Sequence, residues 1–222
     1  MKFYNAIFIA LSFLRSQIRG VGSCVLVVLI LSGCSSQSIN TATSNTTAAP
    51  QAIPQTLKNG YASALQQLQK NKLKQAYQSF DHLTKQYPSY SGPYVNLGLI
   101  HLKQKQLKEA ERQFKKAILA NPSSFSAHHQ LAILYRKQGQ FAEAETHYLV
   151  AKNIAPNSPQ IHRDLAILYD LYMGQLPKAL ALYKNYQTLL QTPDPALRGW
   201  IIDITNRIKV QNKSHESALS KR

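Results

Sequence analysis

Apolar and small side chains recur at a fixed interval along most of this 222-residue chain. From residue 57 onward, five positions repeat through three successive units, always at the spacing that separates Pro88 from Pro122. The columns are Pro88, Pro122 and Pro156; Ala76, Ala110 and Ala144; Phe80, Phe114 and Tyr148; Leu83, Ala117 and Ala151; and Ala64, Gly98 and Ala132. Such a period predicts stacked structural repeats, each of which buries its apolar face against the next. Within one unit, the i, i+3, i+4 spacing of Leu97, Ile100 and His101 predicts a packed helical face.

These columns resemble the tetratricopeptide repeat, a helix–turn–helix whose period has the same length. The second unit carries the family positions most completely, in Tyr94, Leu97, Gly98, Ala110, Phe114, Ala117 and Pro122. The resemblance implies an all-α fold, a right-handed superhelical solenoid of about four helix–turn–helix repeats with a C-terminal capping helix.

The predicted repeats span residues 57–90, 91–124, 125–158 and 159–192. The first is degenerate at its start, because Gly60 and Gln67 occupy usual aromatic positions. The fourth needs one extra residue, which we place in the turn Met173-Gly174-Gln175.

Residues 193–210 are predicted to form the capping helix, because one face carries Leu197, Trp200, Ile201, Ile204 and Ile208. A binding role for Trp200 is the alternative interpretation. Residues 211–222 are predicted to be disordered.

Residues 1–33 have the pattern of a secretory signal peptide. Arg15 and Arg19 precede an apolar run from Cys24 to Leu31, which is too short for a typical membrane-spanning helix. The run ends in Leu31-Ser32-Gly33-Cys34, which resembles the lipobox of bacterial lipoproteins. This resemblance implies cleavage before Cys34 and a covalent lipid anchor, such as palmitate, on that residue. An uncleaved membrane anchor is the alternative.

Residues 34–56 are rich in Ser, Thr, Asn, Ala, Gln and Pro and carry no charge, which predicts a disordered tether after the lipidated cysteine. In lipoproteins that resemble this one, Asp after the cysteine tends to retain the protein at the inner membrane. Ser35 occupies that position here, so we expect an outer-membrane protein that faces the periplasm.

The chain has 26 basic and 10 acidic residues, a formal net charge of +16. A surface this basic favours anionic neighbours. Lys103, Lys105, Lys108, Arg112, Lys115 and Lys116 cluster in one repeat. We interpret this cluster as a solvated convex face. The alternative is a binding surface, for which anionic lipid, cell-wall polymer or an acidic protein is a better partner than nucleic acid.

Candidate chemistry is sparse. Both cysteines precede the repeats, so no disulfide is expected within them. His128 and His162 occupy equivalent columns and are predicted to be packing residues. No metal-ligand spacing, nucleophile motif or phosphate-binding loop is present, so we expect no enzyme activity, no metal and no cofactor beyond the lipid.

Tetratricopeptide arrays resembling this one bind partners in a groove lined by the first helix of each repeat. The predicted partner-binding residues are Tyr61, Leu65, Val95, Leu99, His129, Ile133, Arg136, Arg163 and Ile167, accompanied by Leu68, Leu102 and Asp170. Chaperone-binding members clamp a C-terminal carboxylate with Lys and Asn in this groove. Val95 and Leu99 occupy those columns here and Asn96 matches only in part, so that activity is not expected.

The predicted function is a membrane-anchored protein–protein interaction scaffold that helps to assemble an envelope complex such as a pilus or secretion channel. This prediction rests on an architecture, lipobox plus repeats, that resembles pilotin lipoproteins. The alternative is an adaptor that recruits a cell-wall or polysaccharide enzyme through the basic surface. The sequence does not predict an oligomeric state.

Overall fold

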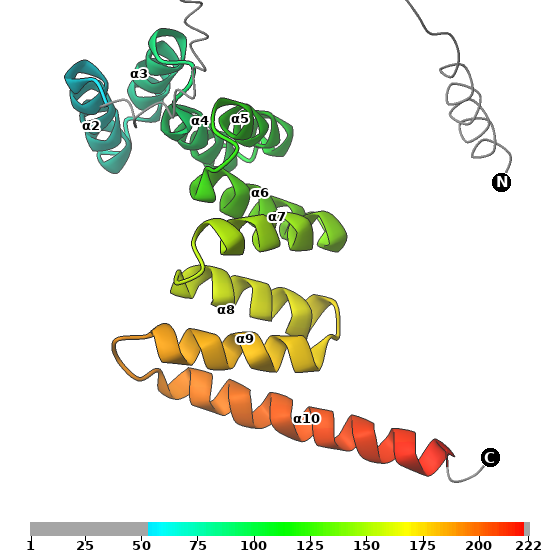
Figure 1. The fold of residues 1–222 in the computed structure, drawn as a ribbon. Helices are drawn as coiled ribbons and strands as arrows, with labels where there is room; N and C mark the ends of the chain where they lie inside the picture. Colours follow the sequence, from blue (N-terminus) through cyan, green and yellow to red (C-terminus); the bar gives the residue numbers. More distant parts are fainter. Residues whose placement is uncertain (1–52, 220–222) are drawn as a thin grey trace, which may run out of the picture. The chain divides into compact units, whose positions relative to one another are not determined.

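The computed structural model describes residues 53–219. The predicted signal peptide, Cys34 and nearly all of the predicted tether therefore lie outside the described residues. Between residues 53 and 219 the chain forms nine α-helices and one π-helical turn (Figure 1). The elements are α2 (Gln55–Gln69), α3 (Leu73–Gln86), α4 (Ser91–Lys103), α5 (Leu107–Ala120), α6 (Phe125–Lys137), α7 (Phe141–Ile154), α8 (Pro159–Ile167), the π-turn η1 (Leu168–Tyr172), α9 (Leu176–Leu189) and α10 (Pro195–Leu219).

The helices pack as consecutive hairpins, which confirms the predicted all-α array of helix pairs. α2 packs on α3, α4 on α5, α6 on α7 and α8 on α9, and each hairpin also contacts the next (Figure 1). α10 packs on α9, at the C-terminal end of the array. None of the helices in the described part of the chain is both long and apolar enough to cross a lipid bilayer.

The turn inside each hairpin contains one residue with a left-handed backbone. In the second repeat this residue is Lys105, and the following Gln106 N–H closes the turn by donating to the His101 carbonyl at 2.9 Å. The left-handed residues of the four turns are Asn71 (φ 54°), Lys105 (φ 61°), Gly139 (φ 78°) and Gly174 (φ 63°). The first three follow one another at the repeat interval and the last is one residue late, so the fourth repeat has its extra residue before Gly174.

That extra residue is accommodated inside a helix. The π-turn η1 follows α8 directly, and the Met173 N–H donates to the Leu168 carbonyl, five residues earlier, at 3.1 Å. The insertion predicted at Met173-Gly174-Gln175 is therefore placed slightly too late. Sequence spacing alone could not separate a widened helical turn from a longer loop, because both shift the next helix by one residue.

The small residues of the repeat columns lie where paired helices approach. Ala64, Ala110 and Ala132 are fully buried. Gly98 occupies the tightest crossing, since a Cβ atom there would lie 2.4 Å from a ring carbon of Phe114. Phe114 is itself fully buried between α4 and its neighbours. This repeat therefore requires glycine where the first and third repeats have alanine.

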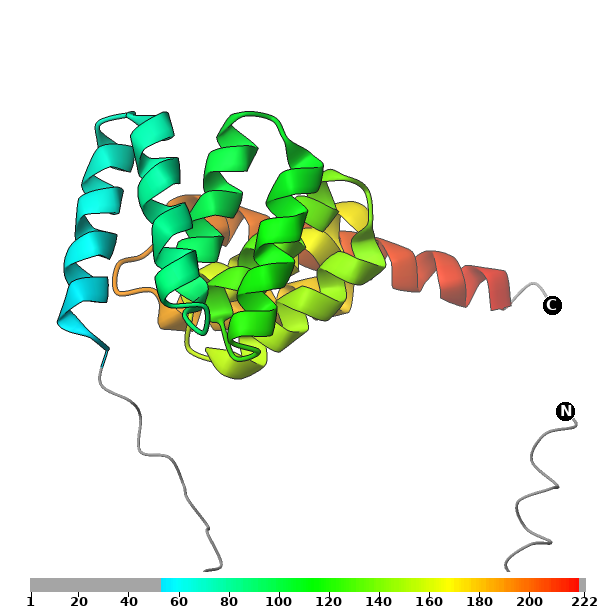
Figure 2. The same cartoon turned by 90° about the horizontal axis from the view of Figure 1, so that it is seen from above.

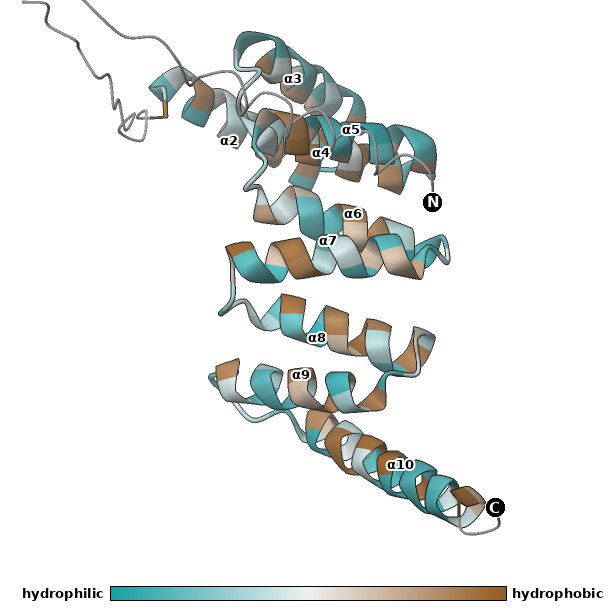
Figure 3. Ribbon diagram, turned by 45° about the vertical axis from the view of Figure 1, so that its right-hand side comes forward, coloured by the Kyte–Doolittle hydropathy of each residue, from teal (hydrophilic) through white to brown (hydrophobic). Residues whose placement is uncertain are grey.

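The buried apolar side chains of the described residues form two clusters that divide at α4. The N-terminal cluster joins α2 and α3 to Leu97 and Ile100 of α4. The larger cluster begins with Val95 on another side of α4 and continues to Leu197 and Ile204 of α10. Figure 3 shows the apolar character of α4 beside the largely polar α5. The first repeat thus depends on one small cluster and a single neighbouring hairpin.

The C-terminal helix is longer than the sequence predicts. Asp194 caps its start, where Oδ1 accepts from the Ala196 N–H at 2.9 Å. The helix continues to Leu219, which corrects the predicted end at residue 210 and the predicted disorder over most of 211–222. The residues beyond 210 are exposed (Figure 2). Residues 211–222 were predicted to be disordered because they lack an apolar face. Residues 200–219 contain neither Gly nor Pro, however, so nothing in this segment ends the helix.

Candidate partner-binding face

The first helices of the four repeats lie next to one another. α4 contacts α6, and side-chain hydrogen bonds join α2 to α4 and α6 to α8. We define the first-helix face as the predicted groove positions that are partly exposed, leaving out His129, whose ring stacks on Phe125 and bonds to Asp164. They are Tyr61, Leu65, Leu68, Leu99, Leu102, Ile133, Arg136, Arg163, Ile167 and Asp170.

Two predicted contact residues are not part of this face. Val95, predicted to contact a partner, is only 6% exposed and packs in the larger core cluster, so it offers a partner almost no surface. The His129 side chain is 11% exposed, because its ring stacks on Phe125 at 5.4 Å and bonds to Asp164. His129 therefore joins two repeats and offers a partner little surface. The position of a residue in the repeat does not by itself show whether its side chain is accessible to a partner.

A neutral hydrogen bond joins the first two repeats on this face. The Asn96 amide nitrogen donates to the Tyr61 hydroxyl at 2.6 Å and to the Gly92 carbonyl at 3.0 Å. The Tyr61 ring meets Phe80 edge-on at 5.5 Å. Burial raises the pKa of Tyr61, although the Asn96 bond partly opposes this shift, so the phenol stays protonated. The neighbouring Leu65 and Leu68 make this half of the face apolar.

A charged network occupies the equivalent place between the third and fourth repeats. His129 Nε2 donates to Asp164 Oδ2 at 2.8 Å, and Arg163 pairs with Asp164 Oδ1 at 3.0 Å. Burial alone would raise the pKa of Asp164, but the His129 bond and the Arg163 charge lower it. Asp164 is therefore an ionised, nearly buried link between α6 and α8.

Arg136 lies farther along α6 and is held by aromatic residues. Its Nε donates to the Tyr148 hydroxyl at 3.3 Å, and its Cζ lies 5.6 Å from the centre of the Tyr172 ring. Tyr172 in turn packs against Phe141 with ring centres 5.1 Å apart. Burial raises the pKa of Tyr148 to about 12, although Arg136 partly opposes this shift, so Tyr148 remains a neutral hydrogen-bonding partner.

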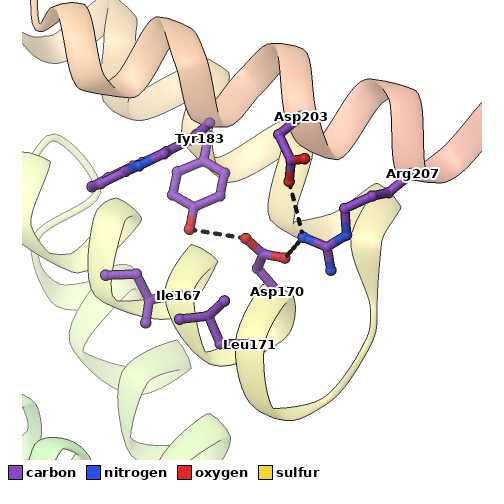
Figure 4. Close-up of a pocket in the computed structure, with 7 residues that line it drawn as sticks. Ile167, Asp170, Leu171, Tyr183, Asp203 and Arg207 are labelled. Carbon is purple, nitrogen blue, oxygen red and sulfur yellow. Dashed lines mark hydrogen bonds and ion pairs between the residues drawn. The ribbon is translucent and has the colours of Figure 1, made fainter.

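A pocket of about 280 Å³ opens where η1, α9 and α10 meet (Figure 4). Asp170 lies in it, paired with Arg207 of α10 at 2.7 Å and accepting from the Tyr183 hydroxyl at 3.4 Å. Asp203 also pairs with Arg207, at 3.4 Å. Ile167, Leu171 and Trp200 complete the lining. The helix predicted to cap the array thus also contacts the end of the first-helix face.

Four residues of the basic cluster, Lys108, Arg112, Lys115 and Lys116, lie on α5 and form a separate surface that we call the α5 ridge. It borders a shallow depression of about 430 Å³. Arg112 pairs with Glu109, and Lys115 pairs with Glu111 at 2.7 Å. The depression is lined by Lys108, Glu111, Arg112, Lys115, Lys116 and Leu119. Part of the basic charge is therefore neutralised locally.

The histidine columns serve packing. His128 and His162 are each 7% exposed, and their Nε2 atoms donate to the carbonyls of Pro122 at 3.0 Å and Pro156 at 2.7 Å. His147 donates from Nδ1 to the free Nδ1 of His128 at 3.0 Å. Between residues 53 and 219 no group of three or more His, Cys, Asp or Glu side chains is placed to hold a metal ion.

Sequence reasoning missed three residues that shape this face: Asp164, Leu171 and Tyr172. The sequence did contain a pattern that indicates the role of Asp164, since the spacing from His129 to Asp164 equals the spacing from Tyr61 to Asn96. No sequence pattern indicated the exposure of Leu171 and Tyr172, which lie in the π-turn. The resulting face offers apolar contact in its N-terminal half and fixed charges in its C-terminal half, an arrangement suited to binding a polypeptide.

Comparisons with known proteins agree with this geometry. Residues 101–168 match the sequence profile of the tetratricopeptide repeat. A search of curated protein sequences found no match. The structure of pilF from Pseudomonas aeruginosa is similar with a TM-score of 0.61 and 15% identity, over 72% of each chain.

Two further solved structures share the fold. A thermophilic TPR protein of Thermus thermophilus has a TM-score of 0.56 and 26% identity, covering 68% of this chain and 82% of its own. MamA from Desulfovibrio magneticus RS-1, from residue 41 to its end, has a TM-score of 0.57 and 17% identity, covering 77% of this chain and 94% of its own.

Proposed function

We infer that this protein is a membrane-anchored tetratricopeptide-repeat scaffold whose first-helix face binds another protein during assembly of an envelope complex such as a pilus or secretion channel. The fold is that of protein-interaction scaffolds, which are generally non-catalytic. One observation carries the proposal: partly exposed apolar side chains on the first helices of all four repeats. They are Tyr61, Leu65, Leu68, Leu99, Leu102, Ile133 and Ile167.

The envelope role is supported by the sequence and by likeness. The lipobox Leu31-Ser32-Gly33-Cys34 would place the repeats at a membrane, and Ser35 favours the outer membrane with the repeats in the periplasm. The likeness to pilF concerns the fold alone, at 15% identity. A pilus or secretion-channel component is the class of partner that we propose, on the architecture of a lipobox followed by repeats.

Membrane attachment is tested directly with Cys34→Ser. We expect the wild-type chain in the membrane fraction and labelled by radioactive palmitate, and the variant unlabelled. Absence of label on the wild-type chain would contradict the lipid anchor. That result would not bear on the proposed binding face.

Binding is tested by chemical crosslinking in intact cells and recovery of the chain with its partners. Leu99→Asp places a charge on the first-helix face, whereas Leu119→Asp makes the same change on α5, where Leu119 is 82% exposed. Val95 is left unchanged because it is buried. We expect Leu99→Asp to lose the main crosslinked partner and Leu119→Asp to retain it, with equal melting temperatures.

The alternative, an adaptor that uses the α5 ridge to contact an anionic polymer, predicts the opposite pattern. Its contacts would be lost near physiological ionic strength, because exposed charges are screened over about 8 Å at 0.15 M salt. Loss of the partner in Leu119→Asp or Lys116→Gln, with Leu99→Asp unaffected, would favour this alternative.

A further inference from the structure

Within the described part of the chain, the charged side chains of the C-terminal first-helix face are paired, with one exception. Arg163 pairs with Asp164, and Asp170 pairs with Arg207. Arg136 forms no ion pair with any carboxylate of residues 53–219. A partly desolvated guanidinium without an opposite charge is unfavourable unless a partner supplies one.

Arg136 is also held in a defined position. Tyr148 accepts from its Nε, and the Tyr172 ring lies 5.6 Å from Cζ, so two aromatic residues from different repeats hold the side chain. A guanidinium fixed in this way is suited to a carboxylate, because two parallel N–H groups match its two oxygens. Little side-chain entropy is left to lose on binding.

The exposed ring of Tyr172 lies beside this cation. Tyr172 is 43% exposed, and Leu171 before it in the π-turn is 66% exposed. Ile133 of α6 and Ile167 of α8, both on the first-helix face, are partly exposed as well. The surface around Arg136 therefore combines one unpaired cation with an exposed aromatic ring.

We propose that Arg136 binds the side-chain carboxylate of an Asp or Glu within a polypeptide segment, while Tyr172 contacts an apolar residue next to it. Charge complementarity supports an acidic occupant, since residues 53–219 contain 21 basic and 10 acidic side chains. This inference rests on the proposed function, because it names the chemistry of the segment that the first-helix face would bind.

The test begins with selection of random twelve-residue peptides, displayed on phage, against the purified full-length chain. We expect the recovered peptides to carry a carboxylate within a few positions of an aromatic or large aliphatic residue. One such peptide is then synthesised with its carboxylate intact and with that carboxylate replaced by an amide. Each version is titrated against the wild type, Arg136→Gln and Lys137→Gln.

Lys137→Gln is the matched control, because it removes the same charge at the neighbouring, exposed position. We expect Arg136→Gln to weaken binding of the acidic peptide about tenfold or more and Lys137→Gln to change it less than about twofold. The amide peptide should bind wild type as weakly as the acidic peptide binds Arg136→Gln. The amide peptide should bind Arg136→Gln and wild type with the same affinity, because the interaction that the variant removes is already absent.

Two outcomes would overturn the inference, and they differ in what they imply. Recovered peptides without a carboxylate preference, or equal losses for both variants, would reject the role of Arg136 and leave a docking face in place. Failure of wild type to bind any peptide at the first-helix face would reject the docking function as well. If Arg136→Gln does not fold, the comparison of acidic and amide peptides on wild type decides the matter.

Discussion

The first two repeats and the last two share one backbone plan but differ in the chemistry of equivalent positions. In the N-terminal half, the first-helix face is apolar and a neutral bond from Asn96 to Tyr61 joins the repeats. In the C-terminal half, the corresponding link is the ionic contact of His129 with Asp164. The hairpin turns differ too, with Asn71 and Lys105 in one half and Gly139 and Gly174 in the other.

This difference shows which positions the fold constrains. Small residues at helix crossings recur in all four repeats, because a larger side chain would separate the helices. The linking positions on the first helices tolerate an amide, a phenol, an imidazole or a carboxylate, provided that neighbours complement each other. The stack therefore allows different chemistry at the links between first helices, as long as each pair matches.

The largest effect is expected at the crossing column. Gly98→Ala should destabilise the chain by about 3 kcal/mol, because the new methyl group would clash with the buried Phe114 ring. The reverse change in the C-terminal half, Ala132→Gly, should cost only about 1 kcal/mol through helix propensity. Chemical denaturation of both variants measures this contrast, and equal costs would show that the two crossings are equivalent.

The next largest difference is expected between the two side-chain links that join first helices, those of Asp164 and Asn96. Asp164→Asn should cost about 2 kcal/mol at neutral pH, because it removes a charged acceptor shared by His129 and Arg163. Asn96→Ala should cost about 1 kcal/mol. The folded pKa of Asp164 is lowered below its ordinary 3.8, so its contribution is present above that pH and is lost as pH falls through the folded pKa. The gap between wild type and Asp164→Asn should accordingly close in acid, as followed by denaturation at several pH values.

The turn residues should respond in opposite directions. Lys105→Gly should stabilise the chain by about 1 kcal/mol, because Lys105 has φ of 61° and glycine adopts that conformation without steric cost. Gly139→Ala should destabilise it by a similar amount, about 1 kcal/mol, for the converse reason. Melting temperatures would contradict this account if the two changes had the same sign.

The smallest effect is a pH dependence confined to the middle of the array. Burial, together with the charges of His128 and Lys115, lowers the pKa of His147 below 6.5. The unfolded chain therefore takes up this proton more readily, so the contribution is intact above pH 6.5 and is lost as pH falls through the folded pKa. Between pH 7.5 and 5.5 we expect wild type to lose more thermal stability than His147→Gln.

The repeating columns were sufficient to predict the helices, their pairing and the crossing residues such as Gly98 and Ala110. They were not sufficient to predict which first-helix residues are buried and which are accessible. Val95 and Leu99 are one helical turn apart, yet only Leu99 retains accessible surface, because the neighbouring hairpin covers Val95. The role of Asp164 also depends on a partner in another repeat. Such contacts arise from packing between units, which spacing within a unit does not specify.

The widened turn η1 changes the phase of the chain as well as its length. One added residue offsets the side chains that follow it in the same helix by about 100° around the helix axis, and η1 confines this offset to its own turn, because Ala179 and Tyr183 of α9 are buried as the repeat columns require. Deleting a single residue between Tyr169 and Gly174 would restore the strict period and keep every hairpin. It would also move the Tyr172 ring away from Arg136, so a one-residue change in length would alter the proposed carboxylate site without disturbing the core.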